Sequence, residues 1–503
     1  MSAFDLDTTL LDLTGSNPGD PPVHWTIRNA VEGVQIFGGI GSGKTSGSGR
    51  MLALKYLSAG FGGLVLTAKP DEKDLWVKYC EIAGRSDDRI IVEPNGEHAY
   101  DFIADEIEKS LDRSIITQNV MQILKTVIRA GEEKGQGRAD DAFWEAALDM
   151  LIVNVIDLCL FAYDEISIRT MHDIVQSLPK QQDKENKPAK VSAFKAAYNS
   201  AAVKVNAAIK EWARHQDPQA LKAMSREEYA EAVHKALPET RAFEYVRQFF
   251  SSTYLNLADK TRSIVDFSFS GFLFRLLRDP VYSLFCDKRT TFKPDDCARG
   301  KIIIINLPVK TYHKVGRDAQ IMFKYIWQRA MEKRPVDDNT RPVFLWADES
   351  QNFLHEYDAE YQATARSSRI ATVYLSQNLP NYYADMGGEK SQYRVKSFLG
   401  TLATKIFHAN ADIETNTYAS DLIGDIGYKE VTKSATESGQ FSAGRTTALK
   451  IDKAVRPEEF GRLKTGGAKN GLQVEAFMHV QGLTFKSGLN YDKVQFIQNY
   501  IPH

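Results

Sequence analysis

Cysteine is scarce in this sequence. The 503 residues include only four cysteines, Cys80, Cys159, Cys286 and Cys297, and no two of them form a C-x-x-C pair. Closely spaced cysteines are the usual mark of a zinc site or a disulfide framework, so neither is expected here. A reducing cytoplasm is the simplest location for such a chain.

An excess of charge of one sign is also missing. Charged residues make up 25% of the chain, yet the formal net charge is only −2. A surface that is basic throughout is therefore excluded, and any contact with nucleic acid must depend on a local patch.

The sequence has no long uninterrupted apolar run. Residues 1–22 lack the basic start and the continuous apolar core of a signal peptide. The stretch most similar to a membrane span, 147–163, contains Asp149, Asn154 and Asp157. Because a spanning helix needs about 20 almost uninterrupted apolar residues, we expect a buried helix of a soluble domain and no membrane anchor in the chain.

What the sequence does have is an alternation of short apolar strands and helices. Helical periodicity dominates between about residues 104 and 290, whereas strands are predicted on either side, at 62–70, 89–96, 301–308, 342–349, 370–378 and 403–409. Such alternation is typical of a parallel sheet covered on both faces. We predict an α/β fold made of a lead-in segment (1–30), a nucleotide-binding domain with a mainly parallel sheet (31–103 and 291–503) and an inserted all-α domain (104–290).

A glycine-rich loop follows the apolar run 34–37. Gly38, Gly43, Lys44 and Thr45 match G-x-x-x-x-G-K-[ST], the phosphate-binding loop. Glycines let backbone N–H groups turn toward a phosphate chain, the lysine supplies positive charge, and the threonine hydroxyl can bind Mg²⁺. A helix expected at 44–59 directs its positive end at the anion.

A flexible Gly/Ser turn is the alternative, but the strand before the loop and the helix after it favour a nucleoside triphosphate. The predicted binding residues are Gly38, Gly39, Gly41, Ser42, Gly43, Lys44, Thr45 and Ser46.

Two acidic residues follow the strand "VFLWA". Asp348 at the end of a buried strand can hold the water shell of Mg²⁺ beside Thr45, and Glu349 can polarise the attacking water. An acidic turn without catalytic function is the alternative interpretation.

The next strand ends in Gln377, which can sense the γ-phosphate because ligands bind at the carboxyl ends of such strands. A local hydrogen-bonding role is the alternative. Arg366 and Arg369 precede that strand, and at a subunit boundary either could reach a neighbour's nucleotide as an arginine finger. Solvated arginines at a helix end are the competing interpretation.

Two further segments stand out by composition. Residues 184–214 hold seven Lys/Arg against two Glu, with Phe194, Tyr198 and Trp212 interleaved. Such a pattern can grip nucleic acid, although a solvated helix face with aromatics in the core is slightly favoured. Residues 433–447, rich in Ser, Thr and Gly, predict a mobile loop.

Taken together, these segments resemble the type IV secretion coupling proteins of conjugation, the TraG/TraD group within the FtsK–HerA superfamily of ring ATPases. The resemblance covers most of residues 30–485. It rests on an ordered set of segments: "GGIGSGKTSGS", "TAKPDEK", "DDAFWEAALDMLI", "FLWADESQNF", "RSSRIATVYLSQN", "TKIFHANADIETNTYASDLIG" and "RPEEFGRLKTGG".

The resemblance implies a RecA-like, hexameric P-loop ATPase, stimulated by DNA, that uses ATP and Mg²⁺ to move DNA or nucleoprotein through a central channel. By position, Asp348 and Glu349 match the Mg²⁺ and catalytic carboxylates, Gln377 the sensor and Arg366 the finger acting in trans, while Lys44 belongs to the phosphate loop. The implied partners are DNA or a relaxase–DNA complex and type IV secretion components.

One departure from the family concerns the membrane. Family members usually begin with transmembrane helices, which this sequence lacks. We therefore expect either a cytoplasmic chain held at the inner membrane through a separate partner or a cytosolic DNA pump. A substrate-receptor adaptor that uses nucleotide only to set its shape is the alternative from another class, and the Asp348–Glu349 pair favours the motor.

Overall fold

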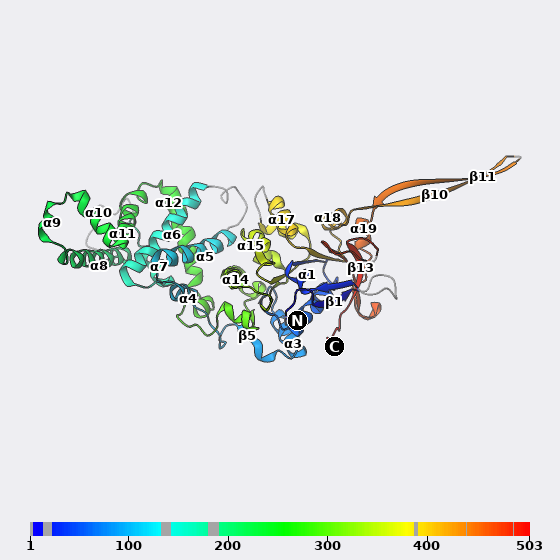
Figure 1. Cartoon of the computed structure of the whole chain (residues 1–503), viewed down its shortest axis with the longest axis horizontal. Helices are drawn as coiled ribbons and strands as arrows, with labels where there is room; N and C mark the ends of the chain where they lie inside the picture. The colour runs from blue at the N-terminus through cyan, green and yellow to red at the C-terminus, as the bar shows by residue number, and fades with distance from the viewer. Residues whose placement is uncertain are drawn as a thin grey trace. The chain divides into compact units, whose positions relative to one another are not determined.

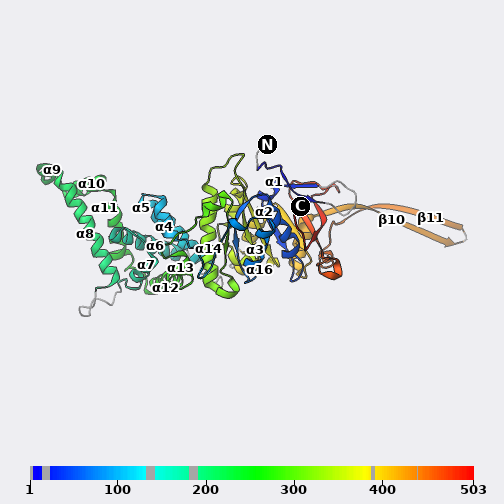
Figure 2. The same cartoon turned by 90° about the horizontal axis from the view of Figure 1, so that it is seen from below.

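The computed structural model describes residues 4–13, 23–131, 142–179, 191–386, 391–438, 440–485 and 487–502. The chain divides into two compact units (Figures 1 and 2). The first comprises Met1–Ile90, Pro294–Lys310 and Trp327–His503, and the second comprises Ile91–Lys293 and Thr311–Ile326. Residues 91–103, 291–293 and 311–326, which the sequence placed with the nucleotide-binding domain, thus lie in the second unit.

A nine-stranded sheet forms the centre of the first unit. Its strands, in spatial order, are β13 (Tyr491–Ile497), β12 (Gln473–Val480), β9 (Thr404–His408), β3 (Val34–Phe37), β8 (Ile370–Ser376), β7 (Val343–Ala347), β4 (Gly62–Leu66), β6 (Ile302–Ile305) and β5 (Arg89–Val92). Neighbours from β9 to β6 pair in parallel, whereas β12 pairs antiparallel with β9 and β13. The predicted α/β fold with a mainly parallel sheet is confirmed.

The six central strands, from β9 to β6, are buried along their whole length. Burial of both faces explains why they read as continuous apolar runs instead of alternating patterns. Since parallel strands end at one edge of the sheet, the segments that follow β3, β4, β7 and β8 come together there.

Helices and a small hairpin also belong to the first unit. The hairpin pairs β1 (Thr9–Leu13) with β2 (Val23–Thr26). The helices are α1 (Ile27–Val31), α2 (Arg50–Ser58), α3 (Glu72–Ile82), α15 (Asp358–Ala365), α16 (Leu379–Met386), α17 (Ser391–Gly400), α18 (Ile413–Ile423) and α19 (Pro457–Phe460), with α14 (Val309–Lys333) supplying residues to both units. Non-helical dihedral angles at His313 kink α14.

A long two-stranded ribbon corrects one prediction. β10 (Asp425–Ser438) and β11 (Gln440–Lys453) pair only with each other, antiparallel along their whole length (Figure 1). The mobile loop predicted at 433–447 is therefore wrong, apart from residue 439, which is outside the described residues. The segment has few large apolar residues and so no alternating pattern, but its threonines favour strands and the backbone ladder pairs them.

Among the described residues of the second unit, regular secondary structure is helical apart from the end of β5, with loops between the helices (Figure 2). Its helices are α4 (Phe102–Lys109), α5 (Arg113–Gly131), α6 (Ala142–Tyr163), α7 (Ile168–Gln176), α8 (Ala193–Arg214), α9 (Pro218–Ala223), α10 (Arg226–Ala236), α11 (Pro238–Gln248), α12 (Asp259–Leu276) and α13 (Val281–Phe285). Hydroxyl and carboxylate N-caps start several of them, as at Asp101, Ser167 and Ser192.

The apolar helix α6 belongs to the core of this unit. Within the described part of the chain, its segment 143–163 is the one helix long and apolar enough to cross a membrane. Leu151, Val155 and Cys159 are nevertheless completely buried. Asp149, on the same helix, forms an ion pair with Lys125 of α5. These contacts agree with the buried helix expected from the sequence.

Candidate functional site

The glycine-rich loop lies between β3 and the helical segment that precedes α2. The loop and the first two residues of that helical segment contain the eight residues predicted to bind phosphate: Gly38, Gly39, Gly41, Ser42, Gly43, Lys44, Thr45 and Ser46. Gly41 and Gly43 have φ angles of 70° and 84°, which non-glycine residues rarely adopt. A Cβ at Gly43 would also lie 2.6 Å from a methyl group of Val474. The curled backbone thus needs glycine at 43 for two separate reasons.

The helix expected at 44–59 is divided. Thr45–Gly49 forms a π-helical turn, η1, before α2 begins at Arg50. Short π-helical turns inside α-helices are rare and occur frequently at functional sites. Here the turn carries the Thr45 hydroxyl.

A buried histidine ties this turn to the sheet. His408 Nε2 lies 2.7 Å from Ser48 Oγ, and its Nδ1 lies 3.1 Å from the Glu475 carbonyl oxygen. Burial lowers the pKa of His408 to about 4, and the nearby charge of Lys44 acts in the same direction, against the hydrogen bond to Glu475. The imidazole is therefore neutral at pH 7, so Nδ1 donates to the carbonyl and Nε2 accepts from the serine.

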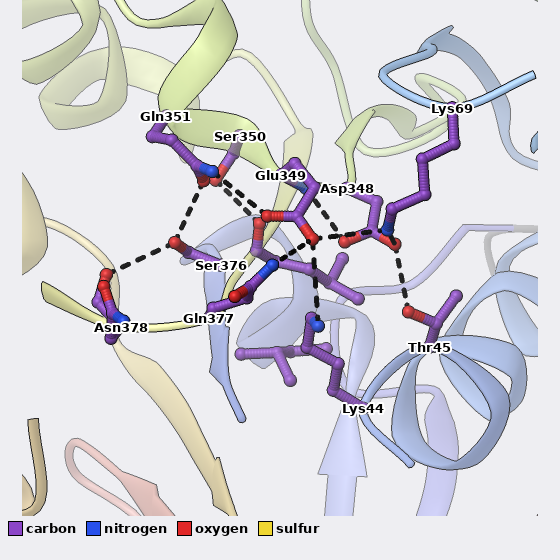
Figure 3. Close-up of polar contacts among 12 residues, drawn as sticks. Lys44, Thr45, Lys69, Asp348, Glu349, Ser350, Gln351, Ser376, Gln377 and Asn378 are labelled. Atoms are coloured by element: carbon purple, nitrogen blue, oxygen red, sulfur yellow. Dashed lines mark hydrogen bonds and ion pairs between the residues drawn. The ribbon is translucent and has the colours of Figure 1, made fainter. Parts of the chain in front are cut away.

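Asp348 follows β7 and faces the phosphate loop (Figure 3). Its Oδ2 accepts a 3.0 Å hydrogen bond from Thr45 Oγ1, and its Oδ1 accepts one of 2.8 Å from the backbone N–H of Glu349. The carboxylate is almost fully buried. The two residues predicted to hold the metal are therefore in direct contact, although 303 positions separate them in the sequence.

Glu349 is held from several sides. Gln351 donates to Oε2 and Gln377 to Oε1, both at 3.0 Å, and Lys44 Nζ lies 4.0 Å from Oε1. Burial alone would raise the pKa of Glu349, but the hydrogen bonds from the two glutamines and the charges of Lys44 and Lys69 lower it below its usual value. The side chain is consequently an anion at neutral pH.

The backbone of Glu349 is left-handed, with φ 48° and ψ 47°. A non-glycine residue in this region costs on the order of 1–3 kcal/mol, and such strain occurs preferentially at active sites. Asn352 supports the turn by donating to the Glu349 carbonyl oxygen at 2.8 Å.

The amide groups beside Glu349 belong to a larger hydrogen-bond network. Of its members, the sequence predicts only Gln377. Ser376 Oγ donates to Gln351 Oε1 at 3.0 Å, and Asn410 Nδ2 donates to the Gln377 carbonyl oxygen at 2.8 Å. The carbonyl oxygen of Ala409, beside Asn410, accepts from the N–H of Gly39 at 2.9 Å. The phosphate loop and Gln377 are thus linked through the segment that follows β9.

Lys69, in the turn after β4, also reaches the two carboxylates (Figure 3). Its Nζ lies 3.3 Å from Asp348 Oδ2 and 3.3 Å from Glu349 Oε1. Burial lowers the pKa of Lys69, but the charges of the two carboxylates outweigh this effect and raise it. Its neighbour Glu72 is buried, and that burial together with the charge of Asp348 raises the pKa of Glu72. The sequence predicts no role for Lys69, because a lone lysine after a strand has no distinguishing pattern.

Arg366, the predicted finger, lies away from these residues. It ends α15 and forms a 3.4 Å ion pair with Glu32, and 60% of its side chain is exposed. Arg366 precedes the amino end of β8, whereas Gln377 follows its carboxyl end, about 20 Å away for a seven-residue strand. The structure therefore does not bring Arg366 together with the phosphate loop of the same chain.

Arg369, the other candidate, is buried. Its guanidinium donates to the carbonyl oxygens of Phe4 and Thr340 at 2.7 and 3.1 Å. The hypothesis that this side chain reaches a neighbouring subunit is wrong, because its hydrogen bonds are made inside its own unit.

A cavity of about 260 Å³ opens over the phosphate loop. Besides loop residues it is lined by Arg50, Leu75, Tyr79 and Gln498. Gln498 Nε2 donates to Ser46 Oγ at 2.8 Å, and Arg50 lies over the Tyr79 ring. The segment after β13 thus borders the phosphate loop. No sequence motif predicts this contact.

The cavity fits a phosphate chain with its metal. Ser42 Oγ is buried and has no hydrogen-bond partner among the residues that the structure describes. In the same part of the chain, no group of three His, Cys, Asp or Glu side chains could hold a metal alone. Mg²⁺ is commonly bound through few protein oxygens together with water and phosphate, which suits Thr45 and Asp348.

The described part of the basic segment in the second unit does not have the arrangement expected of a nucleic-acid-binding surface. Residues 184–190 of this segment lie outside the described residues, and from Ala193 onward it forms helix α8. Its aromatic rings pack inside the unit, Phe194 against Phe250 and Trp212 against Tyr229. Lys204 forms a 2.6 Å ion pair with Asp164. The interpretation as a solvated helix face with packed aromatics is favoured.

Comparisons with known proteins agree with this geometry. The family model for type IV secretory system conjugative DNA transfer matches residues 25–467. Among solved structures, the plasmid coupling protein TrwB with a GTP analogue has a TM-score of 0.56 at 14% identity, over 97% of this chain and 90% of that one. TrwB with ADP and Mg²⁺ has a TM-score of 0.57 at 13% identity, over 95% and 88%. No curated protein matches significantly.

At these identities the structural likeness establishes the fold, while the family model spans most of the sequence. The resemblance noted from the motifs is therefore confirmed: this chain belongs to the family of type IV secretory system conjugative DNA transfer proteins.

Proposed function

We propose that the chain is an ATP-hydrolysing motor of the coupling-protein kind, which delivers DNA or a nucleoprotein to a conjugative channel. The observation that carries the proposal is the convergence of Thr45, Asp348, Glu349 and Gln377 beside Lys44 at one edge of the sheet (Figure 3). A chain that only binds nucleotide has no need of a strained, oriented carboxylate next to the phosphate loop.

The nucleotide would bind in the cavity over the phosphate loop. Structures of TrwB with ADP and Mg²⁺ and with an ATP analogue support ATP and Mg²⁺ as the ligands. The loop N–H groups and Lys44 would hold the phosphates, with the orphaned hydroxyl of Ser42 gaining a partner.

Each carboxylate has a separate role in this proposal. Thr45 and Asp348 would hold Mg²⁺, which neutralises charge on the β- and γ-phosphates. Glu349, kept ionised by its two glutamine donors and by the lysines, would accept a proton from the attacking water. Gln377 would orient that water or sense the γ-phosphate, because it contacts Glu349 directly.

Arg366 would complete the site of an adjacent copy. Its exposure and its place at the opposite edge of the sheet exclude a role in its own site but leave it available to a neighbour. A guanidinium can bind two phosphate oxygens at once. We accordingly propose a homo-hexamer whose hydrolysis is stimulated by DNA.

The partners follow from the family. DNA or a relaxase–DNA complex would be the substrate, and type IV secretion components would receive it. We place the chain on the cytoplasmic side, held at the inner membrane through a partner.

The test is ATP hydrolysis by the purified chain with and without DNA, with Lys44→Ala as the control. We expect turnover that DNA increases and that Lys44→Ala abolishes. Nucleotide binding without turnover in either condition would contradict the motor and favour the adaptor.

A further inference from the structure

Lys69 contacts Asp348, the carboxylate that would hold the metal in the proposed function. It follows β4, whose last residue Leu66 pairs in register with Ala347, so the turn after β4 lies next to Asp348. Lys69 Nζ is 3.3 Å from Asp348 Oδ2, the same oxygen atom that accepts the Thr45 hydroxyl.

The charges of the site make this contact necessary. Asp348, Glu349 and Glu72 are all nearly buried, and Lys69 approaches each of them, at 3.3, 3.3 and 3.9 Å. Lys44 is the other lysine that contacts Glu349, at 4.0 Å. Without Lys69, the repulsion between the carboxylates of Asp348 and Glu349 in a low-dielectric setting would be largely uncompensated.

The Lys69 side chain can also move away from the two carboxylates. Lys69 lies in a turn between β4 and α3, 27% of its side chain is exposed, and it carries its ammonium on a flexible four-carbon stem. Lys44, by contrast, has only 10% of its side chain exposed.

We propose that Lys69 is a resident counter-ion of the metal site. In the nucleotide-free chain it neutralises Asp348 and Glu349 and keeps divalent cations from binding alone. When nucleotide and metal enter together, the ammonium withdraws from Asp348 Oδ2 and releases both carboxylates. Metal binding is thereby coupled to nucleotide binding, and this inference rests on the proposed function of the site.

The experiment measures metal binding, not hydrolysis. Mn²⁺ serves as the probe, and electron paramagnetic resonance counts the free ion in nucleotide-free samples. Wild-type chain should bind Mn²⁺ weakly, whereas Lys69→Gln should bind it at least about tenfold more tightly, because one positive charge has left the site. Adding Asp348→Asn to Lys69→Gln should remove the gain.

Two controls separate charge from general disturbance. Lys69→Arg keeps the charge and should bind Mn²⁺ as weakly as wild type does. Lys78→Gln removes the charge of an exposed lysine on α3 and should also match wild type. Lys69→Met replaces Lys69→Gln if the latter does not fold. In the wild-type chain itself, Mg²⁺ alone should leave the Tm unchanged, while Mg²⁺ with ATP should raise it.

The outcomes distinguish the two levels of the proposal. Equal Mn²⁺ affinity in wild type and a folded Lys69→Gln, or a rise of the wild-type Tm with Mg²⁺ alone, would overturn the role of Lys69 while the nucleotide site stands. A wild-type chain that binds no Mn²⁺ even with ATP would overturn the proposed function and this inference with it.

Discussion

At the scale of single residues, the two adjacent carboxylates are directed at different partners. Asp348 Oδ2 receives the Thr45 hydroxyl, whereas Glu349 receives the amides of Gln351 and Gln377. The left-handed backbone at Glu349 produces this divergence, because it turns the chain between the two side chains. In the proposed function, Asp348 would hold the metal and Glu349 would face the attacking water.

If Asp348 and Glu349 have separate roles, their variants should show different biochemical defects. Asp348→Asn should weaken Mg²⁺-dependent nucleotide binding and hydrolysis together. Glu349→Gln should bind ATP normally and lose about 10²–10⁴-fold in turnover, because only proton acceptance is lost. Equilibrium binding of a fluorescent ATP analogue, read beside steady-state hydrolysis, distinguishes the two. Near-wild-type turnover in both variants would contradict the assignment.

The sequence predicts these residues because each lies within a recognisable pattern. Lys44 and Thr45 belong to a spaced motif, and Asp348, Glu349 and Gln377 follow apolar strands that had to be parallel neighbours. Lys69 and Gln351 contact Glu349, and Ser376 contacts Gln351, but none of the three belongs to a motif of its own. Their side-chain directions depend on packing, which no local spacing encodes.

At the scale of elements, the turn between β3 and α2 is fixed by its glycines to different degrees. Gly41 and Gly43 both have positive φ angles. A Cβ at Gly41 would meet nothing within 4 Å, whereas one at Gly43 would lie 2.6 Å from Val474.

This difference gives a matched pair of variants. Gly41→Ala should cost about 1–2 kcal/mol of unfolding free energy, from backbone strain alone. Gly43→Ala should cost more, because it adds the clash, and Val474→Ala in the same chain should recover part of the loss. Urea unfolding measures all three. Equal losses in the two single variants would show that the Val474 contact is unimportant.

His408 joins the π-helical turn to β12 and makes that junction sensitive to pH. Its pKa is about 4 in the folded chain against 6.5 for an unperturbed histidine, so the unfolded chain binds the proton first. The contribution of neutral His408 to the free energy of unfolding is fully present above about pH 6.5. As the pH falls toward 4, on the order of 3 kcal/mol of that free energy is lost.

His408→Asn should therefore destabilise the chain at pH 7 but lack this pH dependence. The difference in unfolding free energy between wild type and His408→Asn should shrink as the pH is lowered from 6.5 to 4. Urea unfolding at several pH values checks the trend. A constant difference would mean that His408 is not held neutral.

Elements differ in how well the sequence predicts them. The buried central strands were predicted because a parallel sheet covered on both faces requires continuous apolar runs. β10 and β11 were missed because a ribbon whose strands pair only with each other needs no apolar run. The π-helical turn was missed because its glycines and serines equally suit a loop.

At the scale of the whole molecule, the sequence predicts one unit interrupted by another but not the boundaries. Residues 311–326 cluster with the helical unit although a strand of the sheet precedes them. Membership of a unit depends on long-range packing, which a continuous helical pattern such as that of α14 does not reveal.

In the proposed function, this chain is a motor whose nucleotide site is completed by a second copy. Arg366 lies away from its own phosphate loop and is largely exposed, so this proposal depends on that residue. Arg366→Ala should retain nucleotide binding and lose about 10³-fold in turnover, as arginine fingers do elsewhere.

The most direct test is therefore ATP hydrolysis by mixtures of two inactive variants. Arg366→Ala chains and Lys44→Ala chains should each be inactive alone. Mixed together, they should form some interfaces that pair an intact phosphate loop with an intact arginine finger. DNA-stimulated hydrolysis should return on mixing and should be greatest at intermediate ratios. Normal hydrolysis by Arg366→Ala alone, or no hydrolysis at any mixing ratio, would contradict a nucleotide site shared between two copies.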